Sequence, residues 1–178
     1  GFISDQTTVT FDGIEGTDVE VTSDTVLTVK TPAHATAGFV DVTVNVPDAS
    51  NTESNAYEYI AIPVVSSVLP ASGSVNGGPP VTITGTGFTG ATAVTFGQVS
   101  AGTILTNNGT TLTVQAPANT TDTAGTPVAV SVTTVGGTGT LDSAFTYYDP
   151  PTLTAVTPSS GPTSSTTPLT LTGTNFVT

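Results

Sequence analysis

Apolar and polar residues alternate in short runs along most of the chain. Val81–Gly85 has the order Val-Thr-Ile-Thr-Gly, and Val128–Val132 has the order Val-Ala-Val-Ser-Val. Alternation of this kind over roughly four to eight residues is typical of a strand with one buried face. Between such runs lie Asn107-Asn108-Gly109 and Gly136-Gly137, whose residue types favour tight turns. The pattern therefore predicts short strands joined by turns.

The stretch from about residue 62 to residue 147 contains a complete set of these runs. We expect seven short strands there, at a spacing of roughly ten residues, which is typical of an antiparallel β-sandwich. The first run, Pro63–Pro70, begins and ends with proline, which suits an edge strand. The side chains expected to point into the core are Val81, Ile83, Phe88, Val94, Phe96, Leu112, Val114, Val128, Val130, Val132 and Phe145.

The same pattern occurs nearly three times along the chain. Val94-Thr95-Phe96 repeats Val9-Thr10-Phe11 at an offset of 85 residues, and Phe145 matches Tyr57 at an offset of 88. A regular period indicates one structural unit used in series. We therefore expect an incomplete unit at 1–61 that lacks its first two strands, a complete unit at 62–149, and the first two strands of a further unit at 150–178.

The residues of the complete unit resemble a known family. Asn76–Phe88 has the order Asn-Gly-Gly-Pro-Pro-Val-Thr-Ile-Thr-Gly-Thr-Gly-Phe, and Val94–Gly97, Pro117 and Phe145–Tyr147 follow it. Together with Val68–Gly73, this series is similar to the IPT/TIG family of immunoglobulin-like domains. The resemblance implies an all-β fold of tandem immunoglobulin-like (IPT/TIG, E-set type) antiparallel β-sandwiches. Such domains occur in cell-surface receptors, bacterial surface proteins, secreted glycanases and DNA-binding transcription factors.

The composition limits the kinds of partner that the chain can bind. Its net charge is −12, and Lys30 is its only Lys or Arg. Binding to nucleic acid or to an anionic membrane surface requires cations, so we expect neither partner. No apolar run reaches the roughly eighteen residues of a membrane span, so no membrane insertion is expected. Thr accounts for 41 of the 178 residues, and its branched Cβ favours strands over helices.

Residues suited to catalysis or metal binding are scarce. His34 is the single imidazole and Cys is absent. Nucleophilic catalysis needs a base beside a nucleophile, so we expect no enzyme activity, no catalytic residue and no cofactor. We interpret His34 as a solvated histidine in a loop after a strand. A Ca²⁺ site made of carboxylate and carbonyl oxygens is one interpretation of the densest acid cluster, but we favour a solvated charged face. That cluster comprises Asp12, Glu15, Asp18 and Glu20.

Glycans are candidate partners of the surface. Asn108 and Asn119 each begin an Asn-X-Thr sequence, the acceptor for N-glycosylation. Outward-facing rows of Thr are also suitable acceptors for O-linked sugars. The alternative, which we slightly favour for the Thr residues, is that they are there as uncharged strand residues.

Both ends of the chain fall at the same phase of the repeat. Gly1-Phe2 and Asn175-Phe176 both match Gly87-Phe88. One hypothesis is that residues 150–178 complete the 1–61 unit of the next copy by strand donation. A second is that the 178 residues are one period of a longer continuous polypeptide. A third is that the ends are ragged.

These observations favour a structural function over a chemical one. We expect an extracellular or cell-surface module of a filament, stalk or surface fibre, assembled head to tail with copies of itself as partners. The alternative is a carbohydrate- or receptor-binding module of an adhesin or secreted glycanase, for which exposed tyrosines would form the platform. The residues expected at junctions between units are Tyr57, Tyr59, Pro63, Tyr147, Tyr148, Pro150 and Pro151.

Overall fold

The computed structural model describes residues 2–3, 6–119 and 121–176. Within them the regular structure consists of strands, which confirms the all-β prediction. No helix that is long and apolar enough to cross a membrane is found among these residues. The chain divides into two compact units, 1–61 and 62–178. The division after residue 61 coincides with the first predicted boundary, whereas the boundary at 149/150 stays a prediction.

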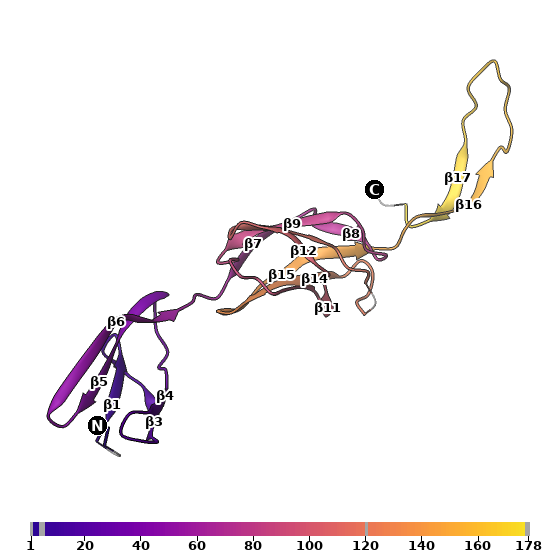
Figure 1. Ribbon diagram of the computed structural model, residues 1–178. Coiled ribbons are helices and arrows are strands. Elements are labelled where there is room, and N and C mark those ends of the chain that lie inside the picture. The colour runs from indigo at the N-terminus through magenta and orange to yellow at the C-terminus, as the bar shows by residue number, and fades with distance from the viewer. Residues whose placement is uncertain (1, 4–5, 120, 177–178) are drawn as a thin grey trace. The chain divides into compact units, whose positions relative to one another are not determined.

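The second unit contains a complete sandwich, which we call the central sandwich (Figure 1). One sheet has the strand order β11-β10-β14-β15-β8, and the facing sheet has the order β12-β13-β9-β7. All neighbouring strands are antiparallel except β8, which is parallel to β15. The strands are β7 (Val64–Leu69), β8 (Ser72–Ser74), β9 (Pro80–Thr86), β10 (Ala93–Phe96), β11 (Val99–Ser100), β12 (Ile104–Asn107), β13 (Thr111–Gln115), β14 (Pro127–Thr134) and β15 (Gly137–Tyr148).

The prediction of seven antiparallel strands in this stretch was therefore wrong in detail. The described residues of the central sandwich form nine strands, and one pairing is parallel. The strands β8 and β11 have only three and two residues, too few for alternation to reveal them.

The core of the central sandwich agrees with the predicted inward set. All eleven predicted side chains are buried, with at most 7% of their surface exposed. The rings of Phe96 and Phe145 meet edge to face at 5.0 Å, an arrangement that aromatic pairs favour. The buried hydrophobic residues that the prediction omitted are Val65, Val68, Ala101, Ala116 and Tyr147.

The backbone of the first strand of the central sandwich lies unusually close to two glycines. A Cβ on Gly85 would collide with the carbonyl oxygen of Val64, and a Cβ on Gly139 would collide with that of Pro63. Glycine at these positions lets the residues entering β7 pack tightly between β9 and β15. Pro63 is consequently buried.

The first unit has the same plan but a smaller core. Its sheets have the orders β2-β1-β5-β6 and β3-β4. Val9, Phe11 and Val40 are its buried hydrophobic residues, and other apolar side chains pack against them while partly exposed. The strands are β1 (Thr8–Phe11), β2 (Ile14–Glu15), β3 (Thr17–Val21), β4 (Leu27–Lys30), β5 (Gly38–Val46) and β6 (Ala49–Tyr59).

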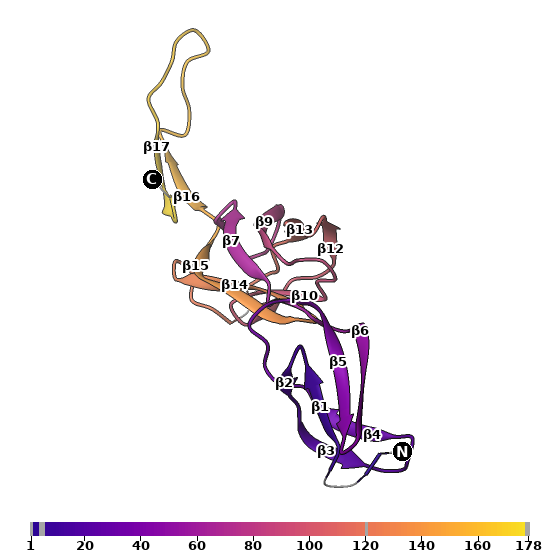
Figure 2. The ribbon, with the colours of Figure 1, turned by 90° about the vertical axis from the view of Figure 1, so that its left-hand side faces the viewer.

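Residues 152–174 form an antiparallel hairpin of β16 (Thr152–Thr157) and β17 (Thr170–Thr174), seen in Figure 2. Thr152 pairs with Thr174 and Val156 with Leu171, and the register shifts between Leu153 and Ala155. Adding 88 to each residue of the β7–β9 pairing, including its register shift, reproduces this pattern. The hairpin therefore reproduces the pairing of β7 with β9 in the central sandwich.

The two hairpins differ in burial, and this predicts different responses to truncation. Ile83→Ala is expected to destabilise the central sandwich by about 2–5 kcal/mol, because the Ile83 side chain is fully buried. Its counterpart Leu171 is 53% exposed, so Leu171→Ala in the unassembled chain should change the unfolding free energy by at most about 0.5 kcal/mol. Chemical denaturation of dilute protein measures both. Equal losses would contradict the difference in burial between Ile83 and Leu171.

Candidate functional site

The four acids of the densest cluster do not converge on one point in the described structure. All four are exposed, and the described residues contain no group of three or more His, Cys, Asp or Glu that could hold a metal. Asp18 pairs instead with Lys30 at 2.6 Å, and both side chains are largely in solvent, where such a pair adds little stability. Asp12 faces a different residue, His34. The Ca²⁺ interpretation of Asp12, Glu15, Asp18 and Glu20 therefore has no support in the geometry.

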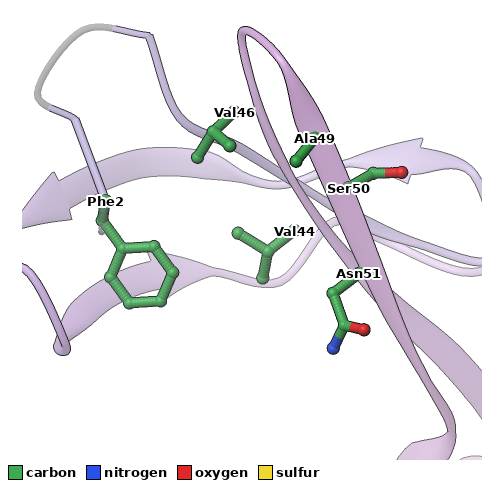
Figure 3. Close-up of a pocket in the computed structure, with 6 residues that line it drawn as sticks. All are labelled: Phe2, Val44, Val46, Ala49, Ser50 and Asn51. Carbon is green, nitrogen blue, oxygen red and sulfur yellow. The ribbon is translucent and has the colours of Figure 1, made fainter.

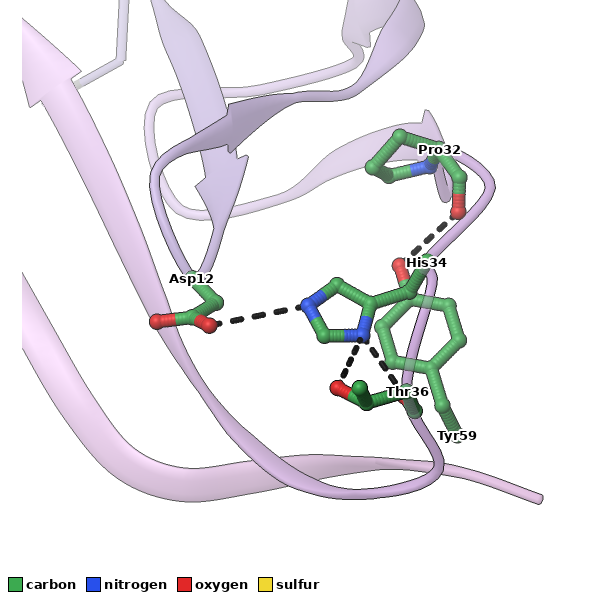
Figure 4. Close-up of polar contacts among 5 residues, drawn as sticks. All are labelled: Asp12, Pro32, His34, Thr36 and Tyr59. Carbon is green, nitrogen blue, oxygen red and sulfur yellow. Dashed lines mark hydrogen bonds and ion pairs between the residues drawn. The ribbon is translucent and has the colours of Figure 1, made fainter. Parts of the chain in front are cut away.

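His34 lies in a loop, as predicted, but the expectation that it is solvated was wrong. Only 9% of its side chain is exposed (Figure 4). Its ring stacks on Tyr59 with centroids 4.7 Å apart, and its Nδ1 lies 2.7 Å from the carbonyl oxygen of Thr36. Its Nε2 lies 3.5 Å from a carboxylate oxygen of Asp12. Both ring nitrogens thus have partners within the unit, and the histidine fixes the loop against the sandwich.

Tyr59 and Tyr147 make the same contact in the two units. The Tyr59 hydroxyl donates to the carbonyl oxygen of Pro32 at 2.9 Å, and the Tyr147 hydroxyl donates to that of Pro117 at 3.0 Å. The first bond links β6 to the loop after β4, and the second links β15 to the loop after β13. The sequence contains a signal for this contact, because Tyr147 matches Tyr59 at an offset of 88 residues and Pro117 matches Pro32 at an offset of 85. The contact lies inside a unit, a role that the sequence analysis missed.

The other predicted junction residues have mixed environments. Tyr57 and Tyr148 are each 40% exposed, and Pro150 and Pro151 are exposed. The Tyr57 ring meets Phe11 and Tyr59 edge to face at 5.5 and 5.1 Å. Tyr147 is fully buried and Pro63 is buried, both within the central sandwich. A junction role for the exposed members stays a prediction.

The two predicted glycosylation sites differ in accessibility. Asn108 is exposed, and its side-chain oxygen accepts hydrogen bonds from the backbone N–H groups of Thr110 and Thr111. Asn119 is half-buried, and its side-chain nitrogen donates to the carbonyl oxygen of Asp122 at 2.7 Å. Thr120 lies outside the described residues. The side-chain nitrogen of Asn108 is therefore better placed for glycosylation than that of Asn119.

An unfilled edge is the most unusual surface of the first unit. In the central sandwich β13 pairs with β12 on one side and with β9 on the other. In the first unit its counterpart β4 pairs with β3, and the described residues supply no strand on its other side. Leu27 and Val29 of β4 are half-buried, whereas their counterparts Leu112 and Val114 are fully buried. We call this side of β4 the open edge.

A hollow of about 210 Å³ lies in the first unit at the start of β6 (Figure 3). Phe2, Val44, Val46, Ala49, Ser50 and Asn51 line it. At the corresponding place in the central sandwich, Gly137 and Gly139 lie against Ile62 and Pro63. The hollow therefore corresponds to the position that residues 62–63 fill in the complete unit.

Comparisons with known proteins bear on the family and the fold. The family model described as IPT/TIG domain matches residues 1–59 and 63–147. No curated protein matches the chain.

The solved structures include similar chains of low identity. SGBP-B from a xyloglucan utilization locus of Bacteroides uniformis is 20% identical, with a TM-score of 0.38, over 83% of this chain and 43% of that one. A Bacteroides ovatus SGBP-B in complex with a mixed-linkage heptasaccharide is 15% identical, with a TM-score of 0.38, over 84% and 42%. The plexin A4 extracellular region is 22% identical, with a TM-score of 0.48, over 94% and 15%. The chain spans less than half the length of each, and these likenesses identify no ligand or partner for it.

The buried hydroxyl of Tyr147 predicts that the stability of the fold depends on pH. Burial, and secondarily the negative charge of Asp122, raises the pKa of Tyr147 to about 12. An unfolded Tyr has a pKa near 10, so the protonated hydroxyl favours the folded state, and this contribution disappears as pH rises from about 10 to about 12.

Tyr147→Phe should cost about 1 kcal/mol at pH 8, because it removes the bond to Pro117. Denaturation of both proteins from pH 8 to pH 12 tests the pKa, and the advantage of the unmodified chain should shrink above about pH 10. A constant difference across that range would show that the Tyr147 pKa is not raised.

Proposed function

We propose that this chain, which belongs to the IPT/TIG domain family, is a structural repeat module of an extracellular or cell-surface filament, stalk or fibre, assembled head to tail. The observation that supports the proposal is the repetition of one structural unit along the chain. The first unit has the plan of the central sandwich, and the β16–β17 hairpin has the register of β7 and β9 at an offset of 88 residues. Units of one kind joined in series provide length and spacing.

The outer surface of the strands also suits an exposed fibre. Thr and Ser hydroxyls pair across neighbouring strands, as in Thr43 with Thr52 at 2.8 Å and Ser131 with Thr140 at 2.9 Å. Such pairs stabilise a sheet without adding charge. With Lys30 as its only Lys or Arg, the chain also offers almost no cleavage sites to trypsin-like proteases.

We further propose that the module is not an enzyme. His34, the single imidazole, has partners for both ring nitrogens and is almost fully covered, so it is poorly placed to act as a base on a substrate. General base catalysis requires the base to reach the proton that it removes.

A glycan-binding module is the second candidate, and the tyrosines give it limited support. A sugar platform needs the exposed face of an aromatic ring. Tyr147 is buried, and the ring of Tyr59 is stacked on His34. Tyr57 and Tyr148 stay partly exposed, as does Phe39 at 63%. Titration with xyloglucan and mixed-linkage glucan oligosaccharides, with Phe39→Ala as the comparison, would favour this candidate if binding occurred and the substitution removed it.

Electron microscopy of the native material tests the proposed function. We expect fibres whose axial repeat is set by sandwiches of one kind joined in series. Particles that stay dispersed as single copies at every concentration would contradict a filament, stalk or fibre.

A further inference from the structure

We propose that the central sandwich bears tension along the chain, and that the parallel pairing of β8 with β15 is the contact that resists it. The paired residues are Ser72–Ser74 of β8 and Thr146–Tyr148 of β15, and we call them the parallel clamp. The inference rests on the proposed function, since a stalk or fibre is the setting in which a module is pulled by its two ends. It concerns the central sandwich alone, whose flanking residues on both sides belong to the chain.

The chain enters and leaves the central sandwich at opposite ends of β15 (Figure 1). On entry, Pro63 lies against Gly139, near the start of β15. Before the chain turns into β9, Ser74 pairs with Tyr148, the last residue of β15. Since β15 has 12 residues, it is up to about 40 Å long. Tension that enters before Pro63 and leaves after Tyr148 would therefore act along the length of this strand.

The relative direction of the two strands determines how the clamp would break. Because β8 and β15 are parallel, tension would pull the entering segment one way and the leaving strand the other way, along the ladder. The hydrogen bonds of a parallel ladder are evenly spaced, so sliding loads them together. Pulling on two neighbouring ends instead loads the first pair, and the pairs then open one after another. If β7 separated from β9 first, the tension would pass to β8 and the clamp would still bear it.

Three segments hold the end of β15, where the tension would leave the sandwich. The carbonyl oxygen of Tyr148 accepts a hydrogen bond from the backbone N–H of Val75 at 3.0 Å, and that of Tyr147 accepts one from Gly125 at 2.7 Å. The Tyr147 hydroxyl donates to the carbonyl oxygen of Pro117 at 3.0 Å. The Tyr147 side chain is fully buried, and hydrogen bonds shielded from water are electrostatically stronger than exposed ones. Sliding of β15 would have to break these bonds together with the clamp.

Val75 continues the clamp beyond β8 and is bonded on both sides. Its N–H donates to Tyr148, and its carbonyl oxygen accepts from the N–H of Asn119 at 2.7 Å. It is also the second residue of a turn that is closed by the N–H of Gly77 donating to the carbonyl oxygen of Ser74 at 3.0 Å. Proline is favoured at that position of a turn. Val75→Pro therefore removes the N–H that bonds to β15 but remains compatible with the turn.

Force spectroscopy on the full chain tests the clamp by changing only the points of attachment. The chain has no Cys, so two introduced cysteines can serve as handles. Ala61→Cys with Asp149→Cys pulls along β15, whereas Asn76→Cys with Asp149→Cys pulls on neighbouring points at one end of the sandwich. All three positions are exposed. At the same force the 61/149 tether should unfold at least about tenfold more slowly than the 76/149 tether, since forced unfolding is governed by the unfolding rate.

The Val75 bond provides a second test with a matched control. Val75→Ala also shortens the side chain but keeps the N–H. In the 61/149 tether, Val75→Pro should unfold roughly fivefold faster than Val75→Ala at the same force, because it lacks one hydrogen bond of the loaded set. The ratio should be smaller in the 76/149 tether, where residue 75 lies outside the loaded segment. Equal ratios in the two tethers would indicate general destabilisation and would overturn the clamp.

The outcomes separate this inference from the proposed function. Equal unfolding rates of the 61/149 and 76/149 tethers would overturn the clamp even if the native material forms fibres. This comparison needs neither Val75 variant, so it decides the question if Val75→Pro does not fold. A slower 61/149 tether supports the clamp in a single chain. Dispersed particles in electron microscopy would then contradict the fibre and leave the clamp.

Discussion

The packing of the first hairpin against the rest of the sandwich is the interaction on which the rest of this structure depends. In the central sandwich, β7 and β9 bury Val65, Val68, Val81 and Ile83 almost completely. Each such side chain contributes roughly 1.5–3 kcal/mol when fully buried, so the hairpin supplies a large part of the favourable term in folding. A unit without that hairpin keeps its other strands but exposes part of its core, as the first unit does at Leu27 and Val29.

The two units therefore show which features of the fold belong to the individual unit and which require the hairpin. The hydrogen bonds of Tyr59 to Pro32 and of Tyr147 to Pro117 are present with and without it. Burial of the last strand differs, since Tyr57 is exposed where Phe145 is covered. The Tyr–Pro contact thus belongs to the individual unit, whereas full burial of the last strand depends on the hairpin.

Much of the fold was predictable because alternation reports directly which face of a strand is buried. The predicted core residues of the alternating runs, such as Val81, Ile83, Val128 and Val130, are buried for this reason. The strands β8 and β11 were not predictable, because two or three residues cannot show a period. The covered state of His34 depends on Tyr59, which is 25 residues away in sequence and adjacent only after folding. Similarly, Asp12 and Asp18 belong to one acid cluster in the sequence, but in the fold each carboxylate faces a different residue.

Amide hydrogen exchange on β4 tests the central claim most directly, with β13 of the same chain as the internal standard. If packing of β7 and β9 against the sandwich is what protects its interior, the amides of β13 should exchange slowly, since Leu112 and Val114 are fully buried. The amides of β4, which has no neighbour beyond β3 among the described residues, should exchange faster. Protection of β4 that equals that of β13 would contradict the account.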